Sequence, residues 1–500
     1  MPDLADTLPE NVAAVDLGSN SFHLIVARTG ASEPVVVDRL REMVQLAAGL
    51  DGQRRIKGDA RARALDCLSR FGQRLRHLPP GAVRAVGTNT LRSARDAAEF
   101  LAAAEHALGH TIETISGLEE ARLIFLGVVQ TVPRPARRRL VLDIGGGSSE
   151  LIVGEDFEPL RMESFYMGCV STSHAFFGDG RIDAARWDLA VLAALRELEP
   201  VQAEYRALGW EQAVGASGTI RAVHALVRSA EWTKEGVTLK SLKRLRDTML
   251  KAGHVERLPF DTLDPARASV FPGGVAILLA AFQALKIDRM LQADGALREG
   301  LLYDLLGRIR EQDVRGRSVT ALGDRHHVDW KQAARVEHTA RHLLGKVEGS
   351  WNVGSRPARL MLSWAAQLHE IGLDIAHAHY HKHGEYIIHN ADLLGFSREE
   401  QSMLATLVRA HRRKFPVAAI KALRRQRRMV ERLAVLLRLA VLLHRSRGPE
   451  PLPDFEATAT KKTLALRFPP GWLDDRPLSR ADLEAEAAFV AGQGLELEFA

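Results

Sequence analysis

Two stretches of the chain place a turn of small residues between apolar runs, and an aspartate precedes each turn. In the second, LVLDIGGGSSELIVG at residues 140–154, Asp143 precedes three glycines and two serines, and Glu150 follows them. Consecutive glycines let the backbone approach a ligand closely, and an array of backbone N–H groups binds anions, above all phosphate. Because carboxylates repel phosphate, Asp143 and Glu150 require a cation between them. Mg²⁺ favours carboxylate, water and phosphate oxygens.

The first stretch, NVAAVDLGSNSFHLIVA at residues 11–27, has the same form: a strand, Asp-x-Gly, a small polar turn and a second strand. Its leading aspartate is Asp16. Two copies predict two related domains that face each other, each contributing one turn. For a single turn, the alternative is a plain β-hairpin in which glycine only supplies a positive φ. Both turns run from strand to strand, unlike the strand-to-helix phosphate loops of Rossmann and P-loop proteins.

Glu120 is the candidate general base. It lies in ISGLEEARLIFLGVVQ, residues 115–130, where Ser116 and Glu119 are spaced as a capping box that opens a helix. This leaves Glu120 without a local partner, on a helix whose following turns are apolar. Poor solvation raises the pKa of a carboxyl group toward the range useful for a base. The alternative is an ordinary exposed acid in the first helical turn.

Two arginines are candidates for binding phosphate oxygens. Arg92 lies in AVGTNTLRSARDA, after a strand that ends at Gly87 and a turn capped by Thr88 and Asn89. An arginine near the start of the next helix can bridge phosphate oxygens. Arg267, before the turn FPGG, is a weaker case of the same kind. A solvated surface arginine is the alternative for both.

The surrounding elements alternate in the manner of an α/β protein. Apolar runs predict strands at residues 12–17, 22–27, 34–39, 82–88 and 111–116, and amphipathic patterns predict helices at 59–78 and 93–108. After the second turn, residues 213–229 predict a strand, a turn and a helix. Residues 318–448 show helical periodicity throughout, and the tail predicts strand, helix, strand. We therefore expect domains at 1–133, 134–310, 318–448 and 454–500, with a linker at 130–140.

The composition is that of a soluble protein of several domains: 500 residues, 46% hydrophobic and 26% charged. No run of 18 apolar residues predicts a membrane span. The acidic, polar N-terminus resembles neither a secretory signal nor a transit peptide. The two cysteines, Cys67 and Cys169, cannot form a disulfide framework. A cytoplasmic location is expected.

The net charge of +6 is unevenly distributed. Residues 411–447 hold ten arginines and two lysines against one acid, Glu431. A polyanion would bind such a surface in a salt-sensitive way, whereas the alternative is a solvated helix face on which arginine stems cover apolar surface. The candidate polyanion surface consists of Arg412, Arg413, Lys414, Arg424, Arg425, Arg427 and Arg428.

Six motifs together resemble one family. DLGSNSFHL, GTNTLR, SGLEEARLIFLGV, DIGGGSSEL, GASGT and ADGALREG occur in this order. They are similar to the exopolyphosphatase / guanosine pentaphosphate phosphohydrolase family of the actin-like, sugar-kinase, Hsp70 superfamily, and the resemblance covers nearly the whole chain. It implies an α/β fold of two actin-like (ribonuclease H-like) domains facing a cleft, followed by an all-α HD-like domain and a small α+β C-terminal domain.

The resemblance also implies an activity. We expect an exopolyphosphatase that releases terminal orthophosphate from linear inorganic polyphosphate, with hydrolysis of guanosine pentaphosphate as the alternative. The family needs a divalent metal, usually Mg²⁺, and the second Glu of GLEEA, which is Glu120 here, matches its base. Asp16, Asp143 and Glu150 fall on the metal side. Phosphate-contacting positions fall on Ser19, Asn20, Ser21, Arg92, Gly145, Gly146, Gly147 and Ser148, and Thr219 sits where related kinases hold a nucleotide.

The helical domain departs from a working HD metal site. Its first histidine is His338, but the expected His-Asp pair reads His369-Glu370, and the distal region LLRLAVLLHRS has no aspartate. A metal-bound hydrolase is not expected there. The tract HAHYHKH, with His377, His379, His381 and His383, leaves two readings open, a metal site or solvent-exposed polyanion contacts.

Two further classes of function remain open from the sequence. One is a small-molecule kinase of the same superfamily, and the other is a polyphosphate or nucleic-acid binding protein without catalysis. A base that activates water argues against the kinase. No membrane and no specific nucleic acid is expected as a partner, and the resemblance makes a homodimer the expected assembly.

Overall fold

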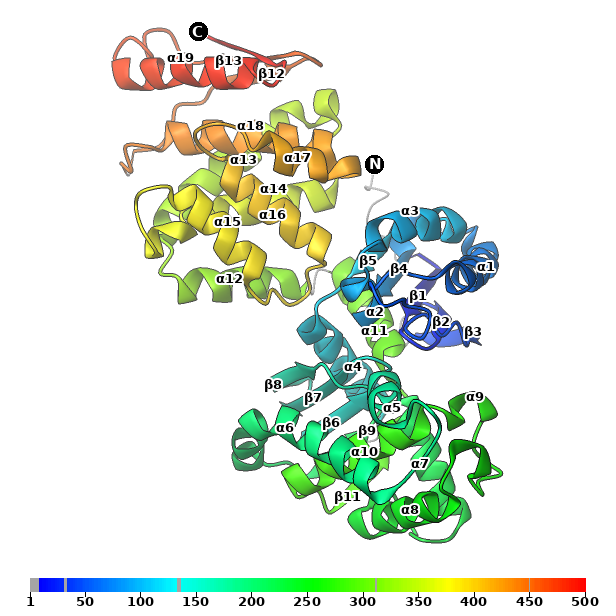
Figure 1. Cartoon of the computed structure of the whole chain (residues 1–500). Coiled ribbons are helices and arrows are strands. Elements are labelled where there is room, and N and C mark those ends of the chain that lie inside the picture. Colours follow the sequence, from blue (N-terminus) through cyan, green and yellow to red (C-terminus); the bar gives the residue numbers. More distant parts are fainter. Residues whose placement is uncertain (1–8, 31–33, 133–135, 311–312, 449) are drawn as a thin grey trace. The chain divides into compact units, whose positions relative to one another are not determined.

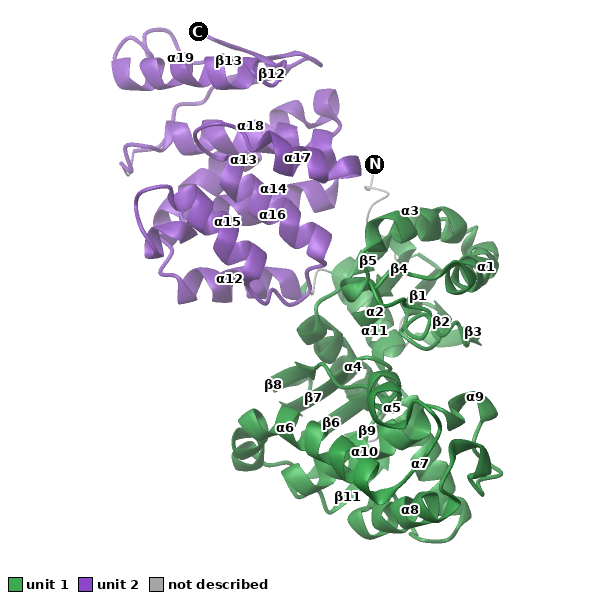
Figure 2. Ribbon diagram, viewed as in Figure 1, with its two compact units in different colours: residues 1–313 green, residues 314–500 purple. Residues whose placement is uncertain are grey.

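The structure is a computed structural model, which describes residues 9–30, 34–132, 136–310, 313–448 and 450–500. Its contacts divide the chain into two compact units, residues 1–313 and 314–500 (Figure 2). Each unit has its own hydrophobic cores. No helix in the described residues combines the length and apolarity needed to cross a membrane.

The first sheet has the strand order β3-β2-β1-β4-β5. Its strands are β1 (Asn11–Leu17), β2 (Phe22–Arg28), β3 (Val35–Glu42), β4 (Val83–Gly87) and β5 (Ile112–Thr114). β1, β2 and β3 form an antiparallel meander, and β4 pairs with β1 in parallel. Helices α1 (Gly58–Leu75) and α3 (Ala97–Leu108) bury their apolar faces in one core with β1 and β2, while the short α2 (Asn89–Ser93) follows β4.

The second sheet repeats this plan, with the order β10-β11-β9-β6-β7-β8. Its strands are β6 (Arg138–Ile144), β7 (Ser149–Glu155), β8 (Glu158–Phe165), β9 (Gln212–Gly215), β10 (Val237–Thr238) and β11 (Arg289–Gln292). β6, β7 and β8 form the meander, and β9 takes the place of β4. The internal repeat and the two strand-to-strand turns predicted from the sequence are confirmed.

Six helices accompany the second sheet. They are α5 (Cys169–Phe177), α6 (Ala184–Leu208), α7 (Gly218–Ser229), α8 (Leu239–Ala252), α9 (Pro265–Ala268) and α10 (Phe271–Leu285), with a 3-10 turn at Val255–Arg257. α10 is buried along almost its whole length. This explains its uniformly apolar sequence, since an α-helix with a polar face would have to expose it.

Helices α4 (Gly117–Thr131) and α11 (Leu297–Ile309) lie between the two sheets (Figure 1). They share one core with residues of β1 and β6, so this core belongs to both halves of the unit. Two glycines allow the helices to pack closely. A Cβ on Gly300 would lie 1.8 Å from the Leu123 carbonyl oxygen, and one on Gly127 would lie 2.0 Å from the Ala296 carbonyl oxygen.

Because the two helices cross so closely, adding one methyl group at Gly300 is expected to lower the stability of the first unit. Gly300→Ala is expected to destabilise the first unit by about 3 kcal/mol, because the backbones of α4 and α11 must separate to admit the Cβ. Gly345→Ala is the matched control, since it lies inside α13 with open space around its Cβ position. The control should be neutral or slightly stabilising. Thermal unfolding of both variants tests the prediction, and equal melting temperatures would contradict it.

The second unit begins with seven helices. They are α12 (Val314–Arg325), α13 (Trp330–Trp351), α14 (Arg356–Leu368), α15 (Tyr380–Asn390), α16 (Arg398–Ala410), α17 (Val417–Ala422) and α18 (Arg427–Leu443). A three-stranded sheet follows, with β12 (Glu456–Ala459), β13 (Thr463–Arg467) and β14 (Glu496–Phe499), and helix α19 (Pro477–Ala491) precedes its last strand. One hydrophobic core runs from the helices into this sheet.

A few elements differ from the sequence prediction. The helix expected from residue 93 begins at Ala97, because residues 94–96 form a turn between α2 and α3. Strand β12 was not predicted, although it pairs with β13 along its whole length. The linker predicted at 130–140 is shorter, since α4 runs to Thr131 and β6 starts at Arg138; residues 133–135 lie outside the described residues.

Candidate active site

The two hairpin turns meet at the mouth of one cavity in the first unit. A Cβ on Gly146 would lie 2.9 Å from the Ser19 Cβ, so the tips of the two turns are in contact. The cavity has a volume of about 130 Å³. This is well below the volume of pockets that enclose a drug-sized ligand, so it suits the end of a substrate better than a whole nucleotide.

Most of the predicted site residues line this cavity. The lining includes Asp16, Ser19, Asn20, Ser21, Glu120, Asp143, Gly145, Gly146, Ser148, Thr219 and Arg267. Three predicted residues are not part of the lining: Arg92 and Glu150 lie directly behind it, and Gly147 packs against the Asn89 side chain, where a Cβ would lie 2.5 Å from the Asn89 Oδ1.

The glycines of the turns serve close approach and do not supply positive φ. No glycine of either turn is among the positive-φ glycines of the described residues. Instead, a Cβ on Gly168 would lie 2.4 Å from the Gly146 carbonyl carbon, and the Gly146 carbonyl accepts hydrogen bonds from the backbone N–H groups of Val170 and Ser171. The plain-hairpin alternative, which needs glycine for its φ, is therefore wrong for these turns.

Three carboxylates line the cavity, and a fourth, Glu150, lies behind it. Asp16 and Asp143 lie next to the last residues of strands β1 and β6. Glu150 is the second residue of β7, and Glu120 lies in the first turn of α4. Burial, and after it the negative charge of Glu120, raises the pKa of Asp143 to about 7. The pKa values of Asp16 and Glu150 are raised well above their ordinary values, again by burial first and then by Glu120.

The carboxylate cluster fits a divalent cation that also binds substrate. The Asp16 Oδ1 is buried and has no hydrogen-bond partner among the described residues. However, no three His, Cys, Asp or Glu side chains of the described residues lie close enough together to hold a metal ion by themselves. The predicted set of Asp16, Asp143 and Glu150 thus does not form a closed cage. Mg²⁺ commonly keeps several waters and binds through one or two carboxylates plus substrate phosphates, which is the arrangement these residues allow.

Glu120 has a partner that the sequence analysis did not find. The Arg92 Nη1 donates to the Glu120 Oε2 at 2.8 Å and to the Ile115 carbonyl oxygen at 3.0 Å. Glu120 has no partner nearby in the sequence, as expected, and it is buried; its partner comes from a distant segment, because α2 brings Arg92 beside the start of α4. Arg92 lies within reach of the base, so the structure joins the predicted base to the predicted phosphate ligand.

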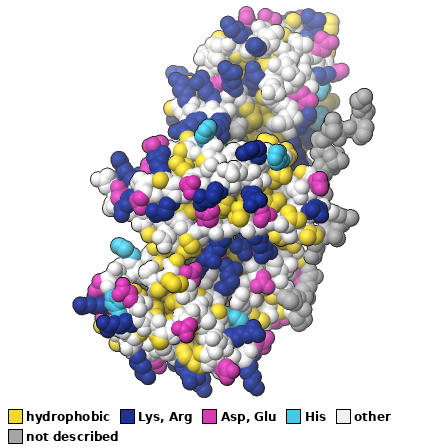
Figure 3. Space-filling model, turned by 90° about the vertical axis from the view of Figure 1, so that its right-hand side faces the viewer, with side chains coloured by type: hydrophobic (Ala, Val, Ile, Leu, Met, Phe, Trp, Pro, Cys, Tyr) yellow, Lys and Arg dark blue, Asp and Glu magenta, His cyan; other side chains and the backbone are white. Residues whose placement is uncertain are grey.

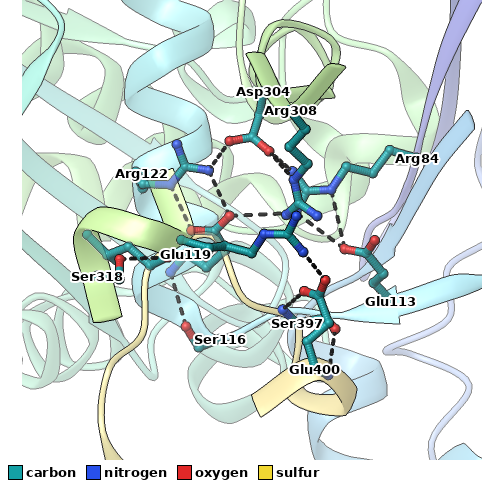
Figure 4. A network of polar contacts seen from close by, with 12 residues as sticks. Arg84, Glu113, Ser116, Glu119, Arg122, Asp304, Arg308, Ser318, Ser397 and Glu400 are labelled. Atoms are coloured by element: carbon teal, nitrogen blue, oxygen red, sulfur yellow. Dashed lines mark hydrogen bonds and ion pairs between the residues drawn. The ribbon is translucent and has the colours of Figure 1, made fainter. Parts of the chain in front are cut away.

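Glu119, next to the base, belongs to a buried ion network (Figure 4). Ser116 caps α4 as predicted, and its Oγ accepts from the Glu119 N–H at 3.1 Å. The Glu119 carboxylate accepts two hydrogen bonds of 2.8 Å from the Arg122 guanidinium. The capping-box role predicted for this side chain is thus replaced by an ion pair.

The network continues from Arg122 to Asp304 on α11 and from there to Arg84 on β4 (Figure 4). Although burial alone would raise it, the pKa of Asp304 is lowered by the charges of Arg122, Arg84 and Arg308. Removing one partner from such a buried group leaves an uncompensated charge. The network therefore anchors the first turn of α4, which carries Glu120, to the neighbouring strand and helix.

Several residues that line the cavity were not predicted. They are His23, Thr88, Cys169, Ser217, Arg221 and Arg298, among others. The face drawn in Figure 3 shows Lys and Arg side chains gathered near its middle, between the two lobes of residues 1–313. Arg221 comes two residues after the motif GASGT, and Arg298 lies within the motif ADGALREG. Both lie in the first turn or two of a helix, where an arginine points back toward the preceding loop.

Comparison with known proteins shows what the chain is related to. Residues 25–309 match the model of the Ppx/GppA phosphatase family, and residues 314–487 match the model of Ppx/GppA phosphatase domain III. The chain belongs to the Ppx/GppA phosphatase family. The family predicted from the six motifs is confirmed.

Curated relatives of this Ppx/GppA protein match it over nearly the full length. The Guanosine-5'-triphosphate,3'-diphosphate pyrophosphatase of Aeromonas hydrophila is 41% identical over 478 residues, and that of Vibrio cholerae is 40% identical over 479 residues; each match covers 95% of both chains. A solved exopolyphosphatase from Cytophaga hutchinsonii has a similar fold, with a TM-score of 0.54 and 24% identity over 60% of this chain and 98% of its own. The predicted fold class, two actin-like domains followed by a helical and a small α+β domain, is confirmed.

In the domain III region, the histidines of the HD-like motif and of the tract 377–383 lie in different environments. His338 is exposed on α13, whereas His369 is buried, with its Nδ1 2.7 Å from the Ala366 carbonyl oxygen. Of the tract 377–383, His381 is buried, and its pKa is lowered to about 4 by burial and by nearby Arg409 and Arg412. No group of metal-ligating side chains was found in the described residues.

The predicted polyanion surface is exposed. The exposed members lie before α17, between α17 and α18, and at the start of α18; they are Arg413, Lys414, Arg424, Arg425, Arg427 and Arg428. Arg412 is partly covered, because its guanidinium lies 4.5 Å from the ring centroid of Tyr380. Arg427 forms an ion pair with Glu431 on the same helix. By contrast, Arg438 is buried and pairs with Glu486, so it serves the core and not a ligand.

Proposed function

We propose that the chain hydrolyses the terminal 5′ phosphate of guanosine pentaphosphate, releasing orthophosphate and guanosine tetraphosphate. The observation that carries a phosphohydrolase is the cavity itself, which is lined by two touching glycine turns and by the carboxylates of Asp16, Glu120 and Asp143. The choice of nucleotide is supported by the names of the curated relatives. This reverses the order expected from the sequence, in which inorganic polyphosphate came first and the nucleotide second.

In the proposed reaction, the backbone N–H groups of both turns and the hydroxyls of Ser19, Ser21 and Ser148 bind the oxygens of the terminal phosphoryl group. Glu120 accepts a proton from a water molecule as the water oxygen attacks phosphorus in line. The bond between phosphorus and the bridging oxygen breaks, and its electron pair stays on that oxygen. A divalent cation, held by carboxylates among Asp16, Asp143 and Glu150, supplies positive charge that offsets the developing negative charge when it is bound.

Arg92 has two possible partners in this reaction. In the structure its guanidinium pairs with Glu120. A guanidinium donates through five N–H groups, so Arg92 can keep this contact and also donate to a phosphoryl oxygen. Preorganised donors of this kind stabilise the charge that develops in the transition state. Thr219 and Arg267 lie farther along the cavity, toward α7 and α9, where the rest of a substrate would extend.

Inorganic polyphosphate is the second candidate substrate, and the exposed basic surface of the second unit favours it. A polyphosphate chain carries about one negative charge per phosphate, and such a polyanion releases counterions when arginines neutralise it. The nucleotide does not need this surface. Both substrates present the same terminal phosphoanhydride, so one site can hydrolyse both.

The decisive experiment measures orthophosphate release from guanosine pentaphosphate and from long-chain polyphosphate side by side, with and without Mg²⁺. A higher kcat/KM for the nucleotide supports the proposal, and a higher kcat/KM for the polymer restores the original expectation. Release from neither substrate would contradict both. ATP with small alcohol or carboxylate acceptors is included to detect kinase activity, which the proposal excludes.

Charge reversal tests whether the exposed basic surface of the second unit binds polyphosphate. Reversing Arg424, Arg425 and Arg428 to glutamate is expected to weaken binding of long polyphosphate at least about tenfold, with a smaller loss for short chains, because only long chains reach enough of the surface. The matched control reverses Lys461, Lys462 and Arg467, which are exposed and give the same change in net charge. Equal losses for both chain lengths, or for both variants, would show that the surface is not a polyanion site.

The homodimer, the cytoplasmic location and the use of Mg²⁺ in place of another divalent metal remain proposals. Sedimentation of the full chain tests the homodimer, since it reports the mass of the particle in solution. A series of divalent metals in the phosphate-release assay tests the preference for Mg²⁺.

A further inference from the structure

His23 occupies in the first hairpin the position that Glu150 occupies in the second. In the β1/β2 register Asp16 pairs with His23, and in the β6/β7 register Asp143 pairs with Glu150. The two hairpins otherwise share their form, so a carboxylate in one is replaced by an imidazole in the other. His23 lines the cavity, only two residues after Ser21.

Two hydrogen bonds determine which nitrogen of His23 carries the proton. The Arg298 Nη1 lies 3.0 Å from the His23 Nδ1, and the His23 Nε2 lies 2.8 Å from the Ser21 Oγ. An arginine can only donate, so the Nδ1 must offer its lone pair. In a neutral imidazole the proton then sits on the Nε2. The Nε2–H therefore donates to the Ser21 Oγ.

The surrounding charges keep His23 neutral. Burial lowers the pKa of His23 to about 3, and the positive charges of Arg298, Arg41, Arg221 and Arg267 lower it in the same direction. These four arginines come from α11, β3, α7 and α9. A protonated imidazole would place a fifth positive charge among them and would lose the hydrogen bond from Arg298.

The direction of these two hydrogen bonds decides whether the Ser21 hydroxyl can donate to a ligand. A serine Oγ that accepts from the Nε2–H has its own hydrogen left to donate. Phosphoryl oxygens of an ionised substrate are acceptors, so they require a donor. With the opposite tautomer, the Ser21 hydrogen would point to His23 and its lone pairs would face the phosphoryl oxygens, which is repulsive.

We propose that His23 is a positioning residue that turns the hydroxyl hydrogen of Ser21 toward the terminal phosphoryl group, with Arg298 selecting the required tautomer. The hydrogen bonds thus lead from Arg298 on α11 to His23 on β2 and from His23 to Ser21 in the first turn. The inference rests on the proposed function only in naming the acceptor as a phosphoryl group. The tautomer itself can be tested without any substrate.

The first test reads the tautomer directly. In the full chain labelled with ¹⁵N-histidine, long-range ¹H–¹⁵N spectra at pH 7 distinguish an Nε2–H imidazole from an Nδ1–H imidazole and from imidazolium. The His23 signals are assigned by their loss in His23→Gln. The expected result is the Nε2–H tautomer, lost in Arg298→Met. An Nδ1–H tautomer or an imidazolium at this position would overturn the proposal.

The second test is a double-mutant cycle on kcat/KM. Ser21→Ala and His23→Leu are each expected to lower kcat/KM about tenfold, the scale of one hydrogen bond to a charged group. The double variant should lose no more than about twofold beyond either single variant, because both remove the same donor. His23→Gln keeps an N–H donor near the Nε2 position and should recover most of the activity. His106→Gln, exposed on α3, is the control.

The outcomes separate this inference from the proposed function. Additive losses in the cycle, or a His23→Gln variant as impaired as His23→Leu, would show that His23 acts only through packing. If the parent protein releases no phosphate from either substrate, the proposed function fails. The same cycle is then measured as orthophosphate affinity by calorimetry, where the same coupling between Ser21 and His23 is expected and its absence refutes the inference.

Discussion

Glu120→Gln is expected to lower kcat by at least about a hundredfold, the usual scale for removing a general base. The amide has nearly the size and shape of the carboxylate but cannot accept the proton of the attacking water. The cavity lining and the turns are unchanged, so substrate affinity should change little. Phosphate release under saturating substrate measures kcat, and binding of the substrate to the variant measures affinity.

The ion pair with Arg92 makes the control important. Since Arg92 donates to Glu120, the substitution also weakens this contact, and a loss of fold could imitate a loss of catalysis. Glu99→Gln, which removes an exposed carboxylate paired with Arg61 on the outer side of the first domain, is the matched control. A Glu120→Gln variant that melts like the parent and still turns over at more than a tenth of its rate would remove Glu120 from the role of base.

The sequence predicted the framework of the first unit well because its signals are local. Apolar runs marked β1, β2, β6 and β7, and the Asp-x-Gly turns between them were visible as a repeat. Ser116 was recognised as a cap because capping depends on residues three positions apart. In each case the physical cause and the sequence signal lie within one turn or one hairpin.

What the sequence could not predict depends on contacts between distant segments. The ion pair of Arg92 with Glu120 joins α2 to α4, and Asp304 reaches Arg84 across more than two hundred positions. The close crossing at Gly300 is equally nonlocal, because a glycine in a helix shows no sign of what packs against it. The motifs ADGALREG and GASGT did mark the right region, but the roles of Arg298 in the first and of Arg221 just after the second became visible only when α11 and α7 were placed around the cavity.

Glu120 illustrates both local and long-range signals, because its position on the helix could be predicted from the sequence and its contacts could not. Its position after a cap was read correctly, and the apolar surface of α4 is real, since Leu123 and Ile124 are buried. However, α11 packs against that surface and Arg92 pairs with the buried Glu120 carboxylate, and neither contact could be read from the sequence. Burial raises the pKa values of Asp16, Asp143 and Glu150, which the sequence assigned to the metal.

That perturbation predicts that Asp143→Asn abolishes phosphate release and yet stabilises the protein without metal. The folded-state pKa of Asp143 is about 7, above the ordinary value of 3.8. The folded protein therefore binds more protons than the unfolded chain between these values, and its stability falls as the pH rises through this window. At pH 8 the carboxylate is ionised in a buried site beside Glu120, and removing its charge should gain up to about 4 kcal/mol, or a rise of about 6 °C in Tm.

Thermal unfolding in the presence of a chelator at pH 5 and at pH 8 tests the sign. The gain of Asp143→Asn over the parent should be smaller at pH 5, where the folded protein keeps Asp143 protonated and only the unfolded chain has released the proton, and should grow toward pH 8. Asp188→Asn, which removes an exposed aspartate on α6 of the same domain, should show no such trend. Adding Mg²⁺ should then raise the Tm of the parent more than that of Asp143→Asn, because a cation that binds the folded protein stabilises it in proportion to its affinity. A gain that is equal at both pH values would mean that Asp143 is not held in a repulsive carboxylate cluster, and the case for a cation between the two turns would fall with it.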